Sequence, residues 1–423
     1  MSRPRGFVVV TGSELVRGDR TDRNGPFLAR ELLRLGLEPA RIAIVGDDPD
    51  ELEVVLREGL EADLCLVSGG LGPTHDDRTV ELVARAAGRE LVVDESLEAE
   101  IEVISRAIAD RLQRPYADFA AGVRKQATLP EGAVVVGIAG TAPGLVLETE
   151  RGAFVILPGP PPELRRLWPR ALERPAVRAV LSRARVPERR VLRFYGASES
   201  EIARALAESG GEGDGVTATV CARDFEIHVD VFADEGGQER VKELVAGLRA
   251  RAGRHLFAED DRPVEELLLD VCRKRGLTLA TAESSTGGLV AARLTSVPGS
   301  SDAFLGGVVA YANALKVAEL GVPAEVIERH GAVSAETAAA MASGARTRLG
   351  ADVAVSTTGI AGPGGGSAEK PVGLVFLHAE GPDGGLAREL RLPGDRGAVR
   401  GRATAAALHL VRTLLTRSRD EDV

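Results

Sequence analysis

The sequence is poor in aromatic residues and in cysteine, and it has no long apolar run. Only 3% of its 423 residues are aromatic, so a platform of stacked rings for nucleic-acid bases is not expected. The cysteines, Cys65, Cys221 and Cys272, are too widely spaced for a metal knuckle or a disulfide framework, which favours a reducing, cytoplasmic location. No run of about 18 apolar residues occurs, and Met1–Gly6 lacks the apolar core of a signal peptide. We therefore expect neither a membrane span nor secretion.

The overall charge argues against one class of partner. The formal net charge is −10, whereas a broad nucleic-acid surface needs clustered Lys and Arg. The Arg-rich segment 178–193 is compatible with an ordinary solvated face. Hydrophobic residues make up 44% and charged residues 27%, as in globular proteins. At about 100–200 residues per domain, the length predicts two or three domains.

The start of the chain alternates short apolar runs with amphipathic segments. Strands are predicted at 7–10, 42–45 and 63–67, and helices at 24–35 and 49–60. This β-α-β-α-β order predicts a mostly parallel sheet with helices on its faces. Ligands of such sheets bind at the carboxyl ends of the strands.

Two glycine-rich motifs follow predicted strands at that edge. TGSELVRG (11–18) and TDRN (21–24) come after the first strand, and SGGLGPTHDD (68–77) comes after the third. Glycines let the backbone approach a phosphate, and adjacent aspartates offer hard oxygen ligands to a divalent ion. The alternative is that Asp76 and Asp77 cap a helix beginning near Arg78. The candidate site residues are Glu14, Asp22, Asn24, Gly69, Gly70, Gly72 and Thr74, with Asp76 and Asp77 as metal ligands.

A smaller unit follows the N-terminal pattern. A strand at 152–157 leads into Pro160–Pro162, which exclude a strand or helix interior, and then into a helix at 164–172. From 174 to about 254 we predict strands at 190–195, 216–221 and 226–232, and helices at 200–207 and 238–251. This α+β unit has no catalytic constellation, so a spacer or dimer-forming role is expected. The acidic stretch 258–263 is interpreted as a linker, and a helix follows at 264–275.

Hydroxyl side chains and a lysine stand out in the C-terminal third. AESSTGG (282–288) lies between an apolar run and a helical pattern, so Ser284, Ser285 and Thr286 either cap the helix or take part in catalysis. Lys316 follows the apolar run 307–310. It acts as a base only if its pKa falls through burial or nearby positive charge. An exposed lysine at a helix start is the alternative.

A glycine loop and two arginines complete this region. VSTTGIAGPGGGS (355–367) follows a predicted strand at 352–357, and its glycines allow close approach to a ligand. It matches neither a Walker loop nor the G-x-G-x-x-G pattern, and a flexible linker is the alternative. Arg396, with Arg400 one helical turn later, either contacts a phosphate or begins a solvated helix that Asp395 caps.

Together these segments resemble the CinA family C-terminal domain. The motifs that carry the resemblance are TAESSTGG (281–288), YANALK (311–316), GAVS (331–334), TTGIAGPGGG (357–366), EKPVG (369–373) and PGDR-x3-R (393–400). Members of that family include nicotinamide mononucleotide amidohydrolases. The resemblance implies hydrolysis of nicotinamide mononucleotide to nicotinate mononucleotide and ammonia, without a metal or organic cofactor. It places the nucleophile on Ser284, the general base on Lys316 and an assisting tyrosine on Tyr311. Family members commonly carry Cys where this chain has Ser285.

The resemblance suggests a mechanism. Neutral Lys316 takes the proton of Ser284, directly or through Tyr311, and Ser284 attacks the carboxamide carbon. The backbone N–H groups of Thr286, Gly287 and Gly288 are expected to hold the oxyanion. The remaining predicted substrate contacts, to the ribose phosphate, are Gly359, Gly362, Gly364, Gly365, Arg396 and Arg400.

The N-terminal motifs, with GTAPG (140–144) and LPGPPPE (157–163), resemble the molybdopterin-binding-like domain of CinA proteins. Relatives bind molybdopterin or, in CinA, have been assigned ADP-ribose pyrophosphatase activity. The resemblance implies a divalent metal, Co²⁺, Mg²⁺ or Mn²⁺, at Asp76 and Asp77. The chain departs from the family pattern at Arg23, where Thr is usual, and at Gly137, where Asn is usual.

We therefore predict an α/β multidomain protein. It has a mostly parallel-sheet molybdopterin-binding-like domain (1–173), a small α+β middle domain (174–257) resembling that of long CinA proteins, and an α/β amidohydrolase domain (263–423). We expect a cytoplasmic homodimer that acts on nicotinamide mononucleotide and ADP-ribose, with no membrane or nucleic-acid partner. Two other classes stay open: a molybdopterin-type binding protein, and a non-enzymatic competence or DNA-damage factor.

Overall fold

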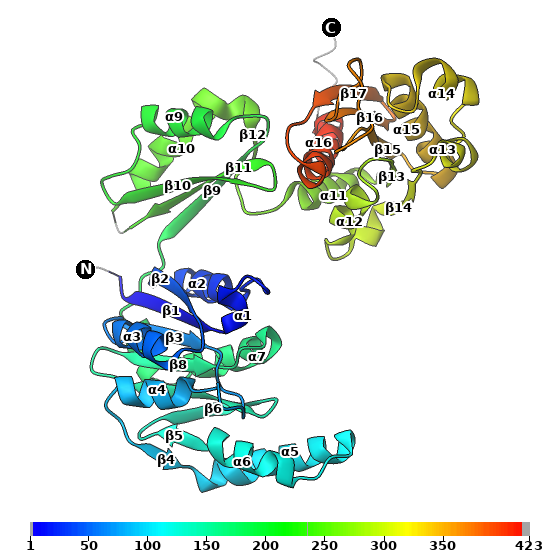
Figure 1. The fold of residues 1–423 in the computed structure, drawn as a ribbon. Helices are drawn as coiled ribbons and strands as arrows, with labels where there is room; N and C mark the ends of the chain where they lie inside the picture. Colours follow the sequence, from blue (N-terminus) through cyan, green and yellow to red (C-terminus); the bar gives the residue numbers. More distant parts are fainter. Residues whose placement is uncertain (1–2, 235, 417–423) are drawn as a thin grey trace. The chain divides into compact units, whose positions relative to one another are not determined.

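The chain divides into two compact units at Pro187/Glu188. The computed structural model describes residues 3–234 and 236–416 (Figure 1). Within that part of the chain, no helix is both long and apolar enough to cross a membrane. The α/β multidomain class predicted from the sequence is confirmed.

The first unit is built on a six-stranded sheet in the order β2-β1-β3-β8-β7-β6. The four strands on one side are parallel, while β7 and β6 are added antiparallel. Alternating residues of the central strands are buried on both faces, with Val9 and Val67 in one core and Val8 and Leu66 in the other. The strands are β1 (Arg5–Thr11), β2 (Glu38–Val45), β3 (Leu64–Ser68), β6 (Val134–Ala139), β7 (Ala142–Glu148) and β8 (Ala153–Leu157).

Helices cover both faces of this sheet, as double-sided burial of parallel strands requires. One face packs against α3 (Pro49–Gly59), α4 (Thr79–Ala86), α5 (Glu95–Leu112) and α6 (Ala117–Gln126). The other packs against α2 (Asn24–Arg34), α7 (Pro161–Leu172) and α8 (Pro175–Leu181). The short helix α1 (Ser13–Val16) follows β1, and β4 (Leu91–Val93) pairs with β5 (Thr128–Pro130).

Two details of the first unit differ from the sequence prediction. Helix α7 starts at Pro161 rather than at 164, because prolines in the first helical turn lose no intrahelical hydrogen bond. Helix α8 buries Val177 and Val180 in the core of the first unit. The unit therefore extends to Pro187 and includes a segment that we had assigned to the middle domain.

The second unit begins with a four-stranded antiparallel sheet in the order β10-β11-β9-β12. Two helices pack on it through Ile202, Val241 and Leu244. Its elements are β9 (Glu188–Phe194), α9 (Glu199–Glu208), β10 (Val216–Arg223), β11 (Glu226–Ala233), α10 (Gln238–Ala252), η1 (Gly253–His255) and β12 (Leu256–Ala258).

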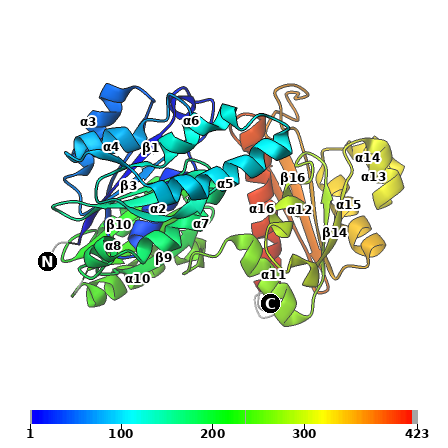
Figure 2. The same cartoon turned by 90° about the horizontal axis from the view of Figure 1, so that it is seen from below.

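A five-stranded sheet, β14-β13-β15-β16-β17, forms the rest of this unit. The strands β14, β13 and β15 are parallel, and β16 and β17 are antiparallel. Helix α15 buries Met341 on one face and α16 buries Leu408 on the other, on either side of β16 in Figure 2. The strands are β13 (Leu279–Glu283), β14 (Phe304–Val309), β15 (Val353–Gly359), β16 (Leu374–Gly381) and β17 (Gly384–Arg391). The helices are α11 (Val264–Arg275), α12 (Leu289–Thr295), η2 (Ser300–Asp302), α13 (Asn313–Leu320), α14 (Ala324–His330), α15 (Ala335–Leu349) and α16 (Arg396–Thr416).

Candidate functional site

The carboxyl ends of β13, β14 and β15 bring the C-terminal motifs together. Ser284, just after β13, donates its N–H to the Thr357 carbonyl of β15 at 2.9 Å. Ala310, just after β14, donates its N–H to the Glu283 carbonyl at 2.8 Å. Parallel pairing thus places the serine turn 284–288, the segment that leads to Lys316 and the glycine loop at one edge of the sheet.

Lys316 points from α13 directly at Ser284. Its Nζ lies 3.1 Å from Ser284 Oγ, 2.9 Å from the carbonyl oxygen of Ala310 and 3.1 Å from that of Tyr311. The side chain is 1% exposed, and burial lowers its pKa. A neutral amine has two N–H donors and one lone pair, which matches two carbonyl acceptors and one serine hydroxyl. The exposed-lysine alternative is therefore wrong.

Glu283 organises the serine turn, and sequence reasoning missed it. Its buried carboxylate accepts hydrogen bonds from the Thr286 hydroxyl (2.8 Å) and from the N–H groups of Gly288 (2.9 Å), Val290 (3.1 Å) and Ala291 (2.8 Å). This carboxylate satisfies the first amides of α12, where an acidic group is favoured. The hydroxyls of Ser284 and Ser285 are thereby left out of helix capping. The signal available in the sequence was a Glu at the end of an apolar run, directly before a Ser/Thr-Gly turn.

The structure corrects the expected oxyanion donors. The N–H of Gly287 donates to the Ser284 carbonyl at 3.1 Å, and that of Gly288 donates to Glu283. Among the described residues, Thr286 is the one predicted donor whose N–H has no acceptor. The N–H of Ser285, which was not predicted as a donor, also has no acceptor there. These two amides are the donors that the turn has left for a ligand.

Tyr311 is not placed to relay a proton. Its side chain is 60% exposed, and its hydroxyl accepts a hydrogen bond from Arg396 Nη2 at 3.0 Å. Lys316 contacts only the backbone carbonyl of Tyr311 and reaches Ser284 itself. The direct route of proton transfer is therefore the one that the geometry supports.

The two predicted arginines hold the site's loops from α16. Arg396 Nη1 donates to the carbonyl of Gly362 at 2.8 Å, and Arg400 Nη2 donates to the carbonyl of Thr286 at 2.8 Å. In the glycine loop, Gly362 and Gly365 have φ values of 78° and 84°, which residues other than glycine rarely adopt. Gly359 ends β15, and Gly364 faces open space. Helix α16 thus contacts both the glycine loop, through Arg396, and the serine turn, through Arg400.

Ser285 supplies a stability prediction. Its buried hydroxyl has no hydrogen-bond partner among the described residues, and such an unpaired group is costly. A thiol tolerates an apolar site better, so Ser285→Cys should raise the free energy of unfolding by about 1 kcal/mol. Urea unfolding measures the change. The matched control is Ser334→Cys, which removes a hydroxyl that accepts the N–H of Thr337 and should therefore destabilise the protein. A less stable Ser285→Cys variant contradicts the prediction.

The N-terminal motifs line a cavity of about 830 Å³ at the carboxyl edge of the first sheet. Eight of the predicted residues border it: Glu14, Asp22, Asn24, Gly69, Gly70, Gly72, Asp76 and Asp77. Asn24 donates to the Ser68 hydroxyl at 2.9 Å and to the Gly159 carbonyl at 2.7 Å. These two hydrogen bonds connect the motifs 21–24, 68–77 and 157–163. Sequence reasoning missed Glu163, a further lining residue whose pKa burial raises.

Thr74 lies behind the two aspartates rather than among the residues that border the cavity. Its hydroxyl donates to Asp76 and Asp77, and its N–H donates to Asp77 at 3.0 Å. Neither aspartate caps α4, whose N-cap is Arg78, so the capping alternative is wrong. In the described residues, no three His, Cys, Asp or Glu side chains gather as a metal site. Any ion at Asp76 and Asp77 needs further oxygen ligands.

Comparison with known protein families finds matches to three consecutive parts of the chain. Residues 7–179 match a probable molybdopterin binding domain, residues 189–258 a damage-inducible protein CinA KH domain, and residues 261–415 a CinA C-terminal domain. The KH identity of the middle domain was not recognised from the sequence.

Similar proteins span the whole chain. A CinA-like protein of Mycolicibacterium paratuberculosis is 44% identical over 432 residues, which cover 97% of this chain and 98% of that protein. A CinA-like protein of Mycobacterium leprae is 44% identical over 420 residues, 97% of each chain. Among solved structures, the competence/damage inducible protein CihA from Agrobacterium tumefaciens is 42% identical, covers 38% of this chain and 100% of its own, and has a TM-score of 0.36.

Proposed function

Because this chain belongs to the CinA family, we propose that its C-terminal domain hydrolyses nicotinamide mononucleotide to nicotinate mononucleotide and ammonia. The observation that carries the proposal is the contact between the buried amine of Lys316 and the hydroxyl of Ser284. Two backbone carbonyls fix this amine, and burial favours its neutral form. A serine beside a neutral lysine is an activated nucleophile for acyl transfer.

The reaction proceeds in two halves. Lys316 takes the Ser284 proton as Oγ bonds to the carboxamide carbon, and the amides of Ser285 and Thr286 stabilise the oxyanion. The C–N bond then breaks, and Lys316 returns the proton to the departing ammonia. Water attacks the acyl-enzyme in the second half, giving a proton to Lys316, which passes it to Ser284 as the carboxylate leaves. Arg396, at the glycine loop, and Arg400, at the serine turn, would meet the ribose phosphate.

The test is the release of ammonia and nicotinate mononucleotide from nicotinamide mononucleotide by the full chain. The assay is run with and without a chelator, because the proposed chemistry uses only side chains and backbone amides. Equal rates in both conditions are expected. Absence of product at millimolar substrate would exclude the proposal.

We propose hydrolysis of the diphosphate of ADP-ribose as a second activity, in the N-terminal cavity. The cavity falls in the size range of small-molecule sites, about 300–1,000 Å³. One or two carboxylates completed by phosphate oxygens are a usual ligand set for Mg²⁺, and Asp76 and Asp77 fit that pattern for Mg²⁺, Mn²⁺ or Co²⁺. Such an ion supplies charge neutralisation at the phosphates and a more acidic bound water. Asp22, which accepts the N–H groups of Asn24 and Gly25, also lines this cavity.

Changing both aspartates to asparagine should abolish this activity. Asp76→Asn with Asp77→Asn is expected to lower metal-dependent release of AMP from ADP-ribose by about 100-fold or more, because the charged ligands are lost. The exposed Asp110→Asn on α5 is the matched control and should behave as wild type. Binding of a pterin without any AMP release would favour the molybdopterin-type alternative. DNA binding that weakens with salt would favour the DNA-damage alternative.

A further inference from the structure

The hairpin between β10 and β11 in the KH domain packs against α16 of the C-terminal domain. The ring of Phe225, in the hairpin turn, lies against Gly401 of α16 so closely that a Cβ at position 401 would force the ring to move, although the residue is 40% exposed. The guanidinium of Arg402 lies over the same ring, 4.9 Å from its centre. Both domains belong to one compact unit, so this packing is an internal contact of that unit.

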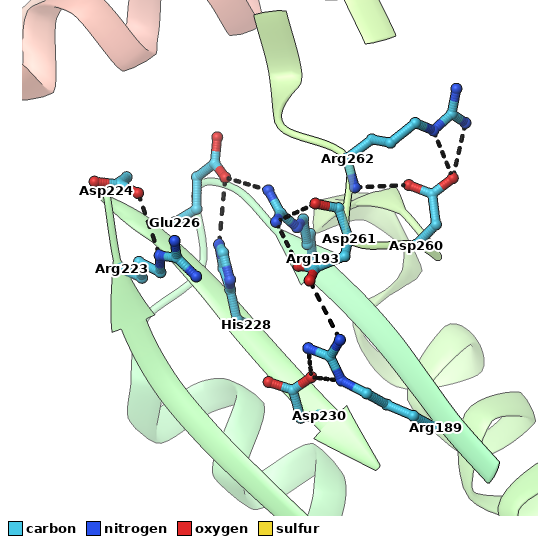
Figure 3. Close-up of polar contacts among 10 residues, drawn as sticks. All are labelled: Arg189, Arg193, Arg223, Asp224, Glu226, His228, Asp230, Asp260, Asp261 and Arg262. Carbon is cyan, nitrogen blue, oxygen red and sulfur yellow. Dashed lines mark hydrogen bonds and ion pairs between the residues drawn. The ribbon is translucent and has the colours of Figure 1, made fainter. Parts of the chain in front are cut away.

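A buried polar contact anchors the hairpin. The Glu226 carboxylate accepts a hydrogen bond from His409 Nε2 on α16 at 2.7 Å, and both residues are 2% exposed. Tyr195 stacks on the His409 ring with centroids 3.8 Å apart. Figure 3 shows His228 and Arg193 of the KH domain converging on the same carboxylate. Of these partners only His409 lies on α16, so its hydrogen bond to the buried carboxylate is the polar contact that fixes the hairpin on the helix.

The turn itself is held in an unfavourable backbone conformation. Asp224 and Phe225 have φ values of 51° and 67°, although neither is glycine. Two-residue hairpin turns of this kind favour Asn-Gly, and a bulky residue at the second position is an outlier. Such an outlier persists only where surrounding contacts determine it, and the contact available here is the ring on α16.

The same turns of α16 hold the candidate site. Arg400 directly precedes Gly401 and donates to the Thr286 carbonyl of the serine turn, while Arg396, one turn earlier, donates to the Gly362 carbonyl. We propose that Phe225 is a positioning residue: by seating on Gly401 it fixes the helix that presents Arg396 and Arg400 to the substrate's phosphate. This inference rests on the proposed amidohydrolase function.

The kinetic test uses Phe225→Gly, which removes the ring and also relieves the positive φ. For nicotinamide mononucleotide, KM is expected to rise at least about fivefold with kcat within about twofold, because phosphate binding weakens equally in the ground and transition states. For nicotinamide riboside, which lacks the phosphate, kcat/KM should not change. Asp224→Gly, which relieves strain and keeps the ring, is the matched control and should behave as wild type. Unchanged KM, or equal losses on both substrates, overturns the proposal.

Hydrogen exchange tests the same inference without turnover. In Phe225→Gly, the hydrogen-bonded amides of the serine turn and the start of α12 should exchange at least about fivefold faster than in Asp224→Gly, because the Arg400 clamp loosens. These amides are those of Ser284, Gly287, Gly288, Val290 and Ala291. Equal exchange in the two variants contradicts positioning. If the wild-type chain releases no ammonia, the proposed function fails, and the exchange result still decides whether Phe225 fixes the turn.

Discussion

Replacing Ser284 with alanine should lower kcat for nicotinamide mononucleotide by about 10⁴-fold or more, with little change in KM. The variant keeps the arginines proposed to meet the phosphate, the turn geometry set by Glu283 and the two free amides, so substrate binding should be retained. It loses the one hydroxyl that the Lys316 amine contacts among residues 3–234 and 236–416, and no acyl-enzyme should form. Single-turnover assays with mass spectrometry of trapped acyl-enzyme measure both the rate and the intermediate.

The neighbouring serine provides the control for this prediction. Ser285→Ala removes a hydroxyl that has no partner in the described part of the chain and that Lys316 does not contact. Its kcat should stay within about tenfold of wild type, since no bond to the reacting atoms is lost. The opposite pattern, with an active Ser284→Ala and an inactive Ser285→Ala, would transfer the nucleophile to position 285.

The pairing of Ser284 with Lys316 was implied by the resemblance to the CinA family, and the structure shows its physical basis: each residue follows a strand of the same parallel part of the sheet. Strand-turn-helix patterning at 279–295 and 304–320 places both segments at the carboxyl edge, where ligands of α/β sheets bind. The same reasoning grouped Asp22 with Asp76 at the edge of the first sheet, and both border its cavity. Topology therefore predicts which motifs meet, even when long stretches of sequence separate them.

The distribution of hydrogen bonds within each motif was not predictable. The N–H of Gly287 donates to the Ser284 carbonyl, and the N–H of Gly288 donates to the Glu283 carboxylate. Which acceptor each N–H meets depends on the geometry of the turn, which the sequence does not specify. The contact between the Tyr311 hydroxyl and Arg396 likewise depends on loop geometry, because it joins two segments that are far apart in the sequence.

The start of helix α16 and its Asp395 cap were among the alternatives, and Asp395 does accept the N–H of Ala398 at 2.8 Å. The helix is not solvated as that alternative assumed, because it is buried around much of its circumference, which also removes the amphipathic stripe that would have predicted its length. The contact between Glu226 and His409 joins residues 183 apart and has no local signature.

Lys316→Met is expected to lower kcat/KM by about 10³-fold, the usual contribution of a general base. Methionine has a similar length and suits a buried site, so the chain should still fold, although the carbonyls of Ala310 and Tyr311 lose a donor. Lys316→Arg is the matched control. It restores hydrogen-bond donors but stays charged and cannot accept a proton, so it should be as inactive as the methionine variant. A variant of either kind with wild-type turnover contradicts the assignment of the base.

The pH profile gives the same base a second test. Burial places the pKa of Lys316 below the ordinary lysine value of 10.5, and only the neutral amine accepts the serine proton. Wild-type kcat/KM should therefore rise with pH through this lowered pKa, and that limb should be missing in Lys316→Met. Between the lowered and the ordinary value, the unfolded chain binds more protons than the folded one, so stability also rises with pH across that window. Urea unfolding at several alkaline pH values should show this rise in wild type and a weaker one in Lys316→Met. If the pKa of Lys316 were not lowered in the folded chain, the activity limb would move up to the ordinary value of 10.5 and the stability dependence would disappear.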